Sequence, residues 1–329
     1  MGRTWRLAFR KLANNALLVS IALLATGFAT FEDTFLTLRN IGALIDQSAV
    51  FAVLAVGATF GIISRNIDIA PASVIALGTV VVALVVHSGH GLALGVLAGG
   101  AVTIAIYLAH GLLVGWIDLD PLIVTLAAWI WARGLAITMT NATTLSLNLP
   151  FVAFMDAPIA FGLTPSSVCA ALVFVAGAIV LRHTRIGMNA FALGQDARLL
   201  QQAGVDPAAA KFAVFGTMGV TTAIGMILMI ARIGAAAPTA GFGLELDAIV
   251  AVIIGGTSFQ GGSGRMLNTL YGVAFIAVLD NGLTGLQMGD PEFLLAKGFA
   301  IVAALLLDVG GRRLVERGRP GLEDALRGD

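Results

Sequence analysis

The residues of this sequence that could do chemistry are concentrated in a few polar interruptions of long apolar runs. The stretch 64–71 (SRNIDIAP) places Arg65, Asn66 and Asp68 between two such runs. Charged groups are costly in hydrocarbon and mostly line an interior, a cavity or an interface, and Pro71 can start the following helix. Two interpretations stay open. The stretch is either a helix break whose polar groups line or gate a polar path, or a short cytoplasmic turn with an Arg65–Asp68 ion pair.

Polar residues in other apolar runs raise a similar choice. Thr125 and Arg133 lie inside the run 121–140, and a buried arginine needs a carboxylate, a cluster of carbonyl oxygens or room to reach the interface. Arg133 therefore serves either a structural ion pair or contact with a substrate. Glu245 and Asp247 stand near the start of another run, where acidic side chains also favour a helix N-terminus.

The sequence carries no recognisable catalytic or metal-binding signature. Its four histidines lack the H-E-x-x-H spacing, and Ser258 and Ser263 do not match a G-x-S-x-G elbow. The glycine-rich run 255–264 has no lysine nearby, so it is interpreted as a flexible, tightly packed turn between helices rather than a phosphate-binding loop. We expect no catalytic residue, no metal site and no cofactor. The balance of 19 basic and 19 acidic residues gives no sign of a nucleic-acid partner.

Composition indicates which elements must position these residues. Of 329 residues, 58% are hydrophobic and 12% charged, about half the charged share of an average soluble domain. A soluble fold could not hide this much apolar surface. We predict an all-α, polytopic transmembrane helical bundle, possibly of two related halves, in one domain over residues 1–329. Its ten or so spans are predicted at residues 13–31, 43–63, 69–87, 92–115, 121–140, 165–181, 212–232, 246–258, 265–286 and 292–310.

The distribution of basic residues predicts the orientation of the bundle. Lysine and arginine are enriched in cytoplasmic loops, and here they gather in the tail 1–12, the loop 182–211 and the tail 311–329. The opposite loops offer only Arg39. The asymmetry predicts an even number of crossings with both termini in the cytoplasm. Within the loop 182–211 a short helix is expected over 196–203.

Glycine spacing predicts close helix packing. Gly91, Gly95 and Gly99 stand four residues apart, and small residues at this spacing let membrane helices approach one another. We therefore interpret these glycines as packing positions rather than ligand contacts.

Five groups of motifs occur in the order known from one family of membrane proteins. They are 65–69 (RNIDI), 121–126 (PLIVTL) followed by Arg133-Gly134, 184–205, 244–249 (LELDAI) followed by 255–264, and 281–282 (NG). With these motifs the chain resembles the membrane permease subunits of ABC importers for monosaccharides, the group that includes ribose, xylose and autoinducer-2 permeases. Ala70, Pro71 and Ala72 depart from the family signature G/N-I-D-L-S-V-G.

The resemblance implies a permease of the bacterial inner membrane that works with other subunits. Two copies, or two related permeases, form the sugar pathway, a periplasmic binding protein delivers the sugar, and a cytoplasmic ATPase binds the ATP. Candidate residues near the pathway are Arg65, Asn66, Asp68, Thr125, Arg133, Glu245 and Asp247. Candidate residues for coupling to the ATPase are Gly187, Asn189, Ala192, Gly194, Asp196, Ala203, Gly204 and Val205.

Two other classes of function remain open alternatives. An ion-gradient-driven secondary transporter is one, since Asp46, Asp68 and Asp280 in apolar surroundings would suit proton or sodium coupling. A purely structural membrane scaffold is the other, and it predicts no change in uptake when the protein is deleted.

Overall fold

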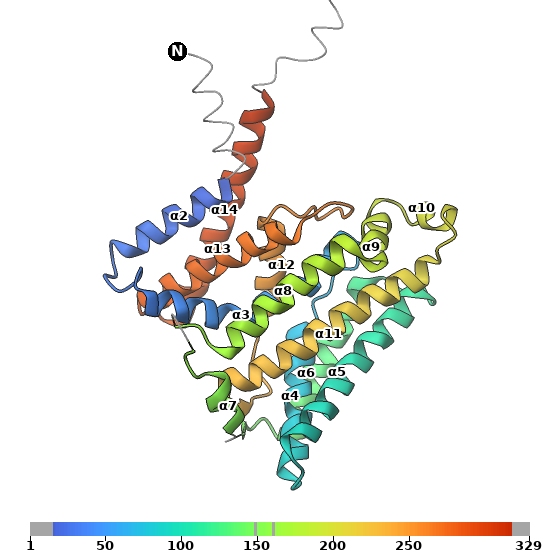
Figure 1. Cartoon of the computed structure of the whole chain (residues 1–329), viewed down its shortest axis with the longest axis horizontal. Coiled ribbons are helices and arrows are strands. Elements are labelled where there is room, and N and C mark those ends of the chain that lie inside the picture. The colour runs from blue at the N-terminus through green and yellow to red at the C-terminus, as the bar shows by residue number, and fades with distance from the viewer. Residues whose placement is uncertain (1–15, 148–149, 160–161, 318–329) are drawn as a thin grey trace, which may run out of the picture. The chain divides into compact units, whose positions relative to one another are not determined.

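The computed structural model describes residues 16–147, 150–159 and 162–317, and this part of the chain is almost wholly α-helical (Figure 1). The helices are α2 (Ala16–Ala29), α3 (Leu38–Ile63), α4 (Pro71–His87), α5 (Leu92–Gly115), α6 (Pro121–Thr140), α7 (Pro150–Met155), α8 (Pro165–His183), α9 (Arg185–Gln195), α10 (Ala197–Gln202), α11 (Pro207–Ile233), α12 (Leu244–Ile254), α13 (Met266–Gly285) and α14 (Asp290–Arg317). Two short strands, β1 (Leu145–Ser146) and β2 (Ala235–Ala236), pair antiparallel.

Six of the described helices are long and apolar enough to cross a membrane, namely α3, α5, α6, α8, α11 and α13. The chain is therefore a multi-pass helical membrane protein. α2 and α4 are apolar but shorter, with 14 and 17 residues. α12 has only 11 residues, about 17 Å of helix against a hydrocarbon core of about 30 Å. The predicted span 246–258 is wrong as one continuous crossing helix, because the chain leaves the helix at the glycines that follow Ile254.

The two ends of the predicted topology are described only in part. The predicted N-terminal tail 1–12 and the last part of the predicted C-terminal tail, 318–329, lie outside the described residues. The tail predicted from residue 311 is helical as far as Arg317, because α14 continues beyond the expected end of its span.

Prolines and polar caps explain where many helices begin. α4, α6, α7, α8 and α11 all start at a proline, whose missing N–H would have no partner in the first turn. The side chain of Asp120 accepts hydrogen bonds from two backbone amides of α6, and Asp206 accepts one from α11. Thr164 and Ser167 form a reciprocal capping box at α8.

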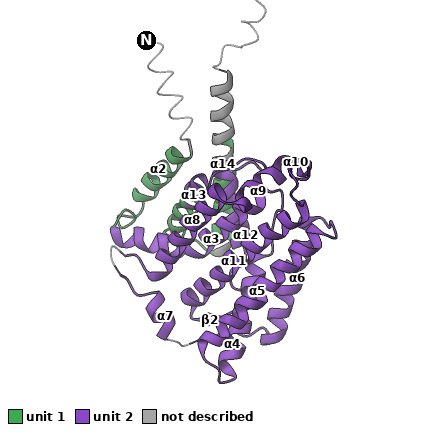
Figure 2. Cartoon of the chain, turned by 45° about the vertical axis from the view of Figure 1, so that its right-hand side comes forward, with its two compact units in different colours: residues 1–37, 274–329 green, residues 38–273 purple. Residues whose placement is uncertain are grey.

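The contacts divide the chain into two compact units (Figure 2). In the unit of residues 38–273, α11 packs extensively against α5 and α3, and α4 packs against α5 and α6. A Cβ added to Gly99 would lie 2.7 Å from the carbonyl oxygen of Gly78, and one added to Gly95 would lie 3.0 Å from that of Val82. The predicted packing role is confirmed for Gly95 and Gly99, whereas Gly91 borders open space.

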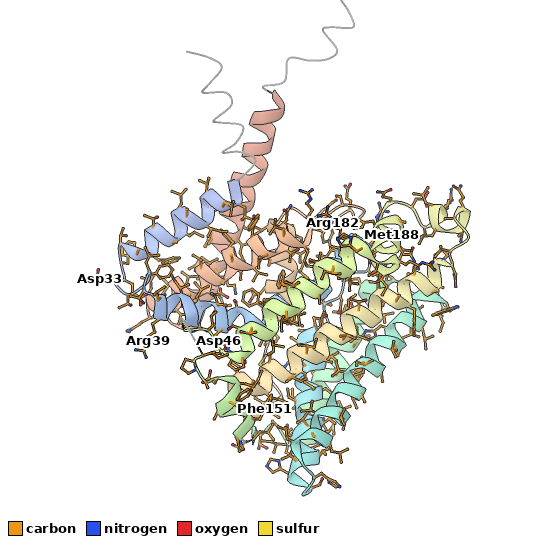
Figure 3. All side chains as sticks on the ribbon, in the orientation of Figure 1. Asp33, Arg39, Asp46, Phe151, Arg182 and Met188 are labelled. Carbon is orange, nitrogen blue, oxygen red and sulfur yellow. The ribbon has the colours of Figure 1, made fainter. Side chains whose placement is uncertain are left out.

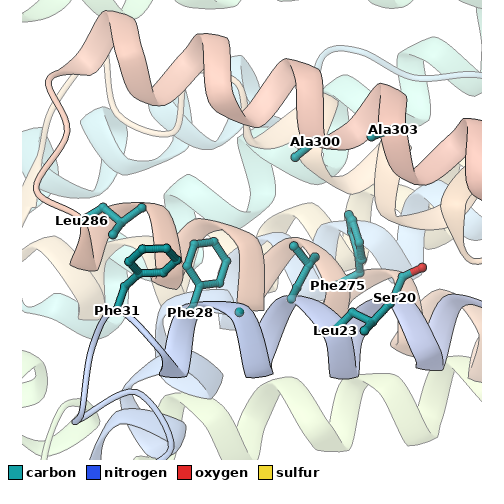
Figure 4. Close-up of a pocket in the computed structure, with 10 residues that line it drawn as sticks. Ser20, Leu23, Phe28, Phe31, Phe275, Leu286, Ala300 and Ala303 are labelled. Carbon is teal, nitrogen blue, oxygen red and sulfur yellow. The ribbon is translucent and has the colours of Figure 1, made fainter.

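The other unit is described here over residues 16–37 and 274–317. This unit has an apolar groove, which Figure 4 shows lined by Phe28 of α2, Phe31 of the turn that follows α2, Phe275 of α13 and Ala300 of α14. Phe28 lies directly against Gly282, where any side chain would overlap the ring. Asp280 on α13 forms an ion pair with Lys297 on α14, with 2.9 Å between Nζ and Oδ1.

Candidate functional site

The first polar cluster lies where the chain leaves α3 and has not yet begun α4. Asp68 is 7% exposed. Its Oδ2 accepts a hydrogen bond of 2.6 Å from the hydroxyl of Tyr107 on α5, and its Oδ1 accepts one of 2.8 Å from the Ala70 amide. Asn66 is also buried, and its Nδ2 donates to the backbone and side chain of Ser64. The segment 64–70 is thus a helix break with buried polar groups.

Arg65 points away from this cluster. It adopts a left-handed backbone conformation, with φ of 61°, and its Nε donates to the carbonyl of Gln260 at 2.5 Å. Arg65 and Asp68 therefore have separate partners, so the predicted Arg65–Asp68 ion pair is wrong, although residues 64 and 65 do form a turn.

Thr125 connects α6 to the helix break. Its side chain is fully buried. Its hydroxyl lies 3.4 Å from the carbonyl oxygen of Ile67 and 3.5 Å from the amide nitrogen of Ile69. These long contacts place Thr125 beside the residue that precedes Asp68 and the one that follows it.

A second polar cluster joins α6 to the start of α12. One guanidinium nitrogen of Arg133, Nη1, donates to the carbonyls of Pro238 and Ala240, both at 2.9 Å. Of the three arrangements that the sequence left open for Arg133, the structure shows the cluster of carbonyl oxygens, and the residue is half-buried. Glu245, in the first turn of α12, accepts a hydrogen bond of 2.9 Å from the indole nitrogen of Trp129. Asp247 lies in the same turn and is half-buried.

A small cavity links the two clusters, because both Asp68 and Glu245 line it, together with Thr221 and Thr222 of α11. About 10 Å³ of it is open to the centre of a water molecule, which is about what one water needs. In this conformation the cavity is too small for a sugar.

The third cluster joins the loop between α8 and α11 to the helix break. The amide of Gly262 donates to the carbonyl of Ile63, the last residue of α3, at 2.8 Å. Gly194 of α9 lies against both groups so closely that a Cβ would overlap them. The prediction that the glycine-rich run forms a tightly packed turn is confirmed. Through Gly194, α9 contacts both the end of α3 and the glycine-rich turn. We call Gly194, Ile63 and Gly262 the glycine junction.

The candidate coupling residues fall into a buried group and an exposed group. Gly187 and Gly194 are buried, whereas Asp196, Ala203 and Gly204 are exposed. The half-buried members are Asn189, Ala192 and Val205. The short helix expected over 196–203 is confirmed as α10, and the Asp196 side chain caps it. α9 was not predicted.

Two aromatic residues of the site were missed by the sequence reasoning. Tyr107 holds Asp68, and Trp129 holds Glu245. Trp129 stands one helical turn before Arg133, a spacing that brings side chains to the same face. This spacing was the available signal. For Tyr107 the sequence offered only one signal, which is that tyrosine is rare in this chain, with two residues in all.

The fold and these clusters together define the class of protein. Buried polar groups at a break between the helices of a multi-pass bundle are typical of membrane transport proteins. Among the described residues, no group of three histidine, cysteine, aspartate or glutamate side chains could hold a metal ion.

Comparison with known proteins narrows this class. The chain belongs to the family described as the permease component of branched-chain amino acid transport systems, which matches residues 40–307. It is 33% identical over 299 residues to the ribose import permease protein of Escherichia coli (strain K12), covering 89% of this chain and 91% of that protein. It is 33% identical over 276 residues to the D-allose transport system permease protein of the same strain, covering 83% and 84%. No solved structure matches the chain.

A relative with lower identity is also a permease of an import system. The autoinducer 2 import system permease protein of Yersinia enterocolitica (serotype O:8, biotype 1B) is 28% identical over 302 residues, covering 92% of this chain and 84% of that protein. The resemblance of the motifs to import permeases is therefore confirmed.

Proposed function

We propose that this chain is the membrane-spanning permease subunit of an ABC importer that carries a monosaccharide or similar small polyol. The proposal is carried by the match of residues 40–307 to a permease family, together with the 33% identity of the chain to a ribose permease and to an allose permease. ATP binding and hydrolysis are assigned to a separate cytoplasmic subunit, and sugar delivery to a periplasmic binding protein. The relatives of this chain are permeases of ribose, allose and autoinducer 2 import systems, which favours this function over that of an ion-driven secondary transporter.

The sugar pathway is proposed to form between this chain and a second permease, either another copy or a related chain. The size of the internal cavity supports this arrangement, because about 10 Å³ of accessible volume cannot hold a sugar. Asp68, Asn66, Thr125 and Arg133 are proposed to lie near the pathway, with Glu245 on the α12 side.

The proposed coupling surface lies on α9 and α10. Met188 projects from α9 (Figure 3) and is 58% exposed. Leu199 on α10 is 45% exposed. Two large apolar side chains left uncovered on a polar segment suit a groove on the ATPase. A shift of that subunit would then reach the helix break through the glycine junction, as a rigid-body movement.

The proposed topology has ten crossings in the bacterial inner membrane, with both termini in the cytoplasm. The six long helices together with α2, α4 and α14 make nine crossings. The tenth crossing is made by α12 and the segment 255–265. A helix of 11 residues followed by irregular backbone can cross only where neighbouring helices cover its polar groups.

Uptake by whole cells tests the proposal. Cells that express or lack the chain are given radiolabelled D-ribose, D-allose or D-xylose, with and without an uncoupler while cellular ATP is held constant. We expect at least one sugar to enter only when the chain is present, and its uptake to persist with the uncoupler. Equal uptake with and without the chain would contradict the proposed permease. Collapse of uptake by the uncoupler would favour ion coupling.

A further inference from the structure

An aromatic pair lies beside the second polar cluster. The rings of Trp129 on α6 and Phe242, just before α12, have centroids 6.2 Å apart and planes inclined at 45°. The indole nitrogen of Trp129 is hydrogen-bonded to Glu245 Oε1, and Arg133 follows one turn later on α6. Two aromatic faces, a guanidinium and a carboxylate therefore meet in one place.

Part of the hydrogen-bonding capacity of this group is unused. Glu245 is 3% exposed, and its Oε2 is buried without a hydrogen-bond partner in the described part of the chain. Arg133 uses only Nη1, and its Nε and Nη2 are likewise buried without a partner among the described residues. Buried charged atoms are costly to leave unpaired, so this site has two donor groups and one acceptor that a ligand could satisfy.

The chemistry of these atoms defines the ligand class. Arg133 and Glu245 carry opposite charges and interact with each other, so the charges of these four side chains balance and select neither an anion nor a cation. Hydroxyl groups both donate and accept hydrogen bonds, which suits a carboxylate oxygen beside guanidinium N–H groups. Aromatic faces suit the apolar C–H face of a sugar ring.

We propose that Trp129, Arg133, Phe242 and Glu245 form a binding subsite for a neutral polyhydroxyl ligand of monosaccharide size. Trp129 and Phe242 supply the stacking faces, and the free guanidinium and carboxylate atoms bind hydroxyl groups. The inference rests on the proposed function and extends it, since Trp129 and Phe242 become substrate-binding residues.

The backbone around Phe242 provides a way for the ligand to reach the polar atoms. Gly241 and Gly243 flank this residue with φ of 72° and 90°, values that favour glycine. Phe242 itself is 73% exposed. The bonds from Arg133 to the carbonyls of Pro238 and Ala240 hold the segment 237–243 in its present position, and ligand entry requires this segment to move.

Saturation-transfer difference NMR on the purified full-length chain in nanodiscs tests the subsite, because it detects weak binding without the binding protein or the ATPase. The probes are D-ribose and D-allose at millimolar concentration. The variant is Trp129→Leu, and the matched control is Trp131→Leu on the same helix, where Trp131 lines an apolar groove. Phe242→Leu is a second variant at an exposed position, and its folding does not depend on the Trp129 contact with Glu245.

We expect the wild type and W131L to transfer saturation to ring protons of at least one sugar. W129L and F242L should lose this signal about fivefold or more, as the loss of an aromatic contact predicts. Equal signals from W129L, F242L and W131L would overturn the subsite, and so would absence of signal from the wild type with both sugars. Failure of the proposed function would be seen separately, as uptake that does not depend on the chain.

Discussion

Substitution of Gly194 by alanine tests whether α9 is held rigidly to the transmembrane helices. Gly194 is a buried residue near the end of α9. A Cβ there would overlap the carbonyl oxygen of Ile63 and the amide of Gly262, and these two groups are hydrogen-bonded to each other at 2.8 Å. Backbone atoms in a paired contact cannot move aside as a flexible side-chain end can, so G194A must displace α9 or break the bond.

A matched control allows the magnitude to be estimated. Gly216 in α11 is also helical, and a Cβ there would meet only a Leu108 methyl group at an ordinary 3.8 Å. Each glycine-to-alanine change gains up to about 1 kcal/mol of helix propensity. Because this gain is common to both variants, the difference in stability between them reports the overpacking cost, about 1–3 kcal/mol.

The assay measures apparent thermal midpoints of G194A and G216A at one fixed scan rate in the same detergent. For a unit of this size the midpoint of G194A should be lower than that of G216A by roughly 2–12 °C. In the reconstituted importer, sugar-stimulated ATP hydrolysis should fall in G194A and not in G216A. Equal midpoints with equal stimulation would refute the reasoning that α9 acts through the glycine junction.

Variants at three further positions test the packing and the coupling surface. Tyr107→Phe removes the 2.6 Å donor to Asp68, and the unpaired carboxylate oxygen should cost about 1–3 kcal/mol; an unchanged thermal midpoint would contradict this. Gly99→Ala should destabilise the packing of α5 on α4, whereas its neighbour Gly100→Ala, with no atom within 4 Å of the added Cβ, should be neutral or stabilising; chemical denaturation of both variants checks the sign of the difference. Gly204→Trp places a bulky side chain at an exposed position with φ of 74°, and it should uncouple ATP hydrolysis from import; an unaltered ratio of sugar imported to ATP hydrolysed would disprove the coupling role.

Apolar composition and the prolines made much of the fold predictable. Long uniform runs identify membrane helices without any knowledge of their neighbours, and a proline marks a helix start through a local effect on its own backbone. The break at 64–70 was also visible, because charged residues between apolar runs are costly unless something pairs them.

The partners of the buried polar residues could not be predicted, because they come from distant parts of the chain. Arg65 and Asp68 are three residues apart, a spacing that suggests an ion pair, yet Arg65 bonds Gln260 and Asp68 bonds Tyr107. The sequence contains no signal for these contacts, which depend on how the helices pack. α9 was missed for a related reason, since its glycines disfavour a helix and are required by the close contacts that tertiary packing imposes.

In the proposed importer, sugar crosses the membrane through this permease, and ATP hydrolysis in another subunit drives the transport. The most direct test of this proposal is accumulation of the sugar identified by whole-cell uptake inside proteoliposomes that contain the chain and its partner ATPase, supplied with loaded binding protein. We expect accumulation only when ATP is present on the ATPase side. Accumulation by the chain alone, driven by a proton or sodium gradient without nucleotide, would contradict it.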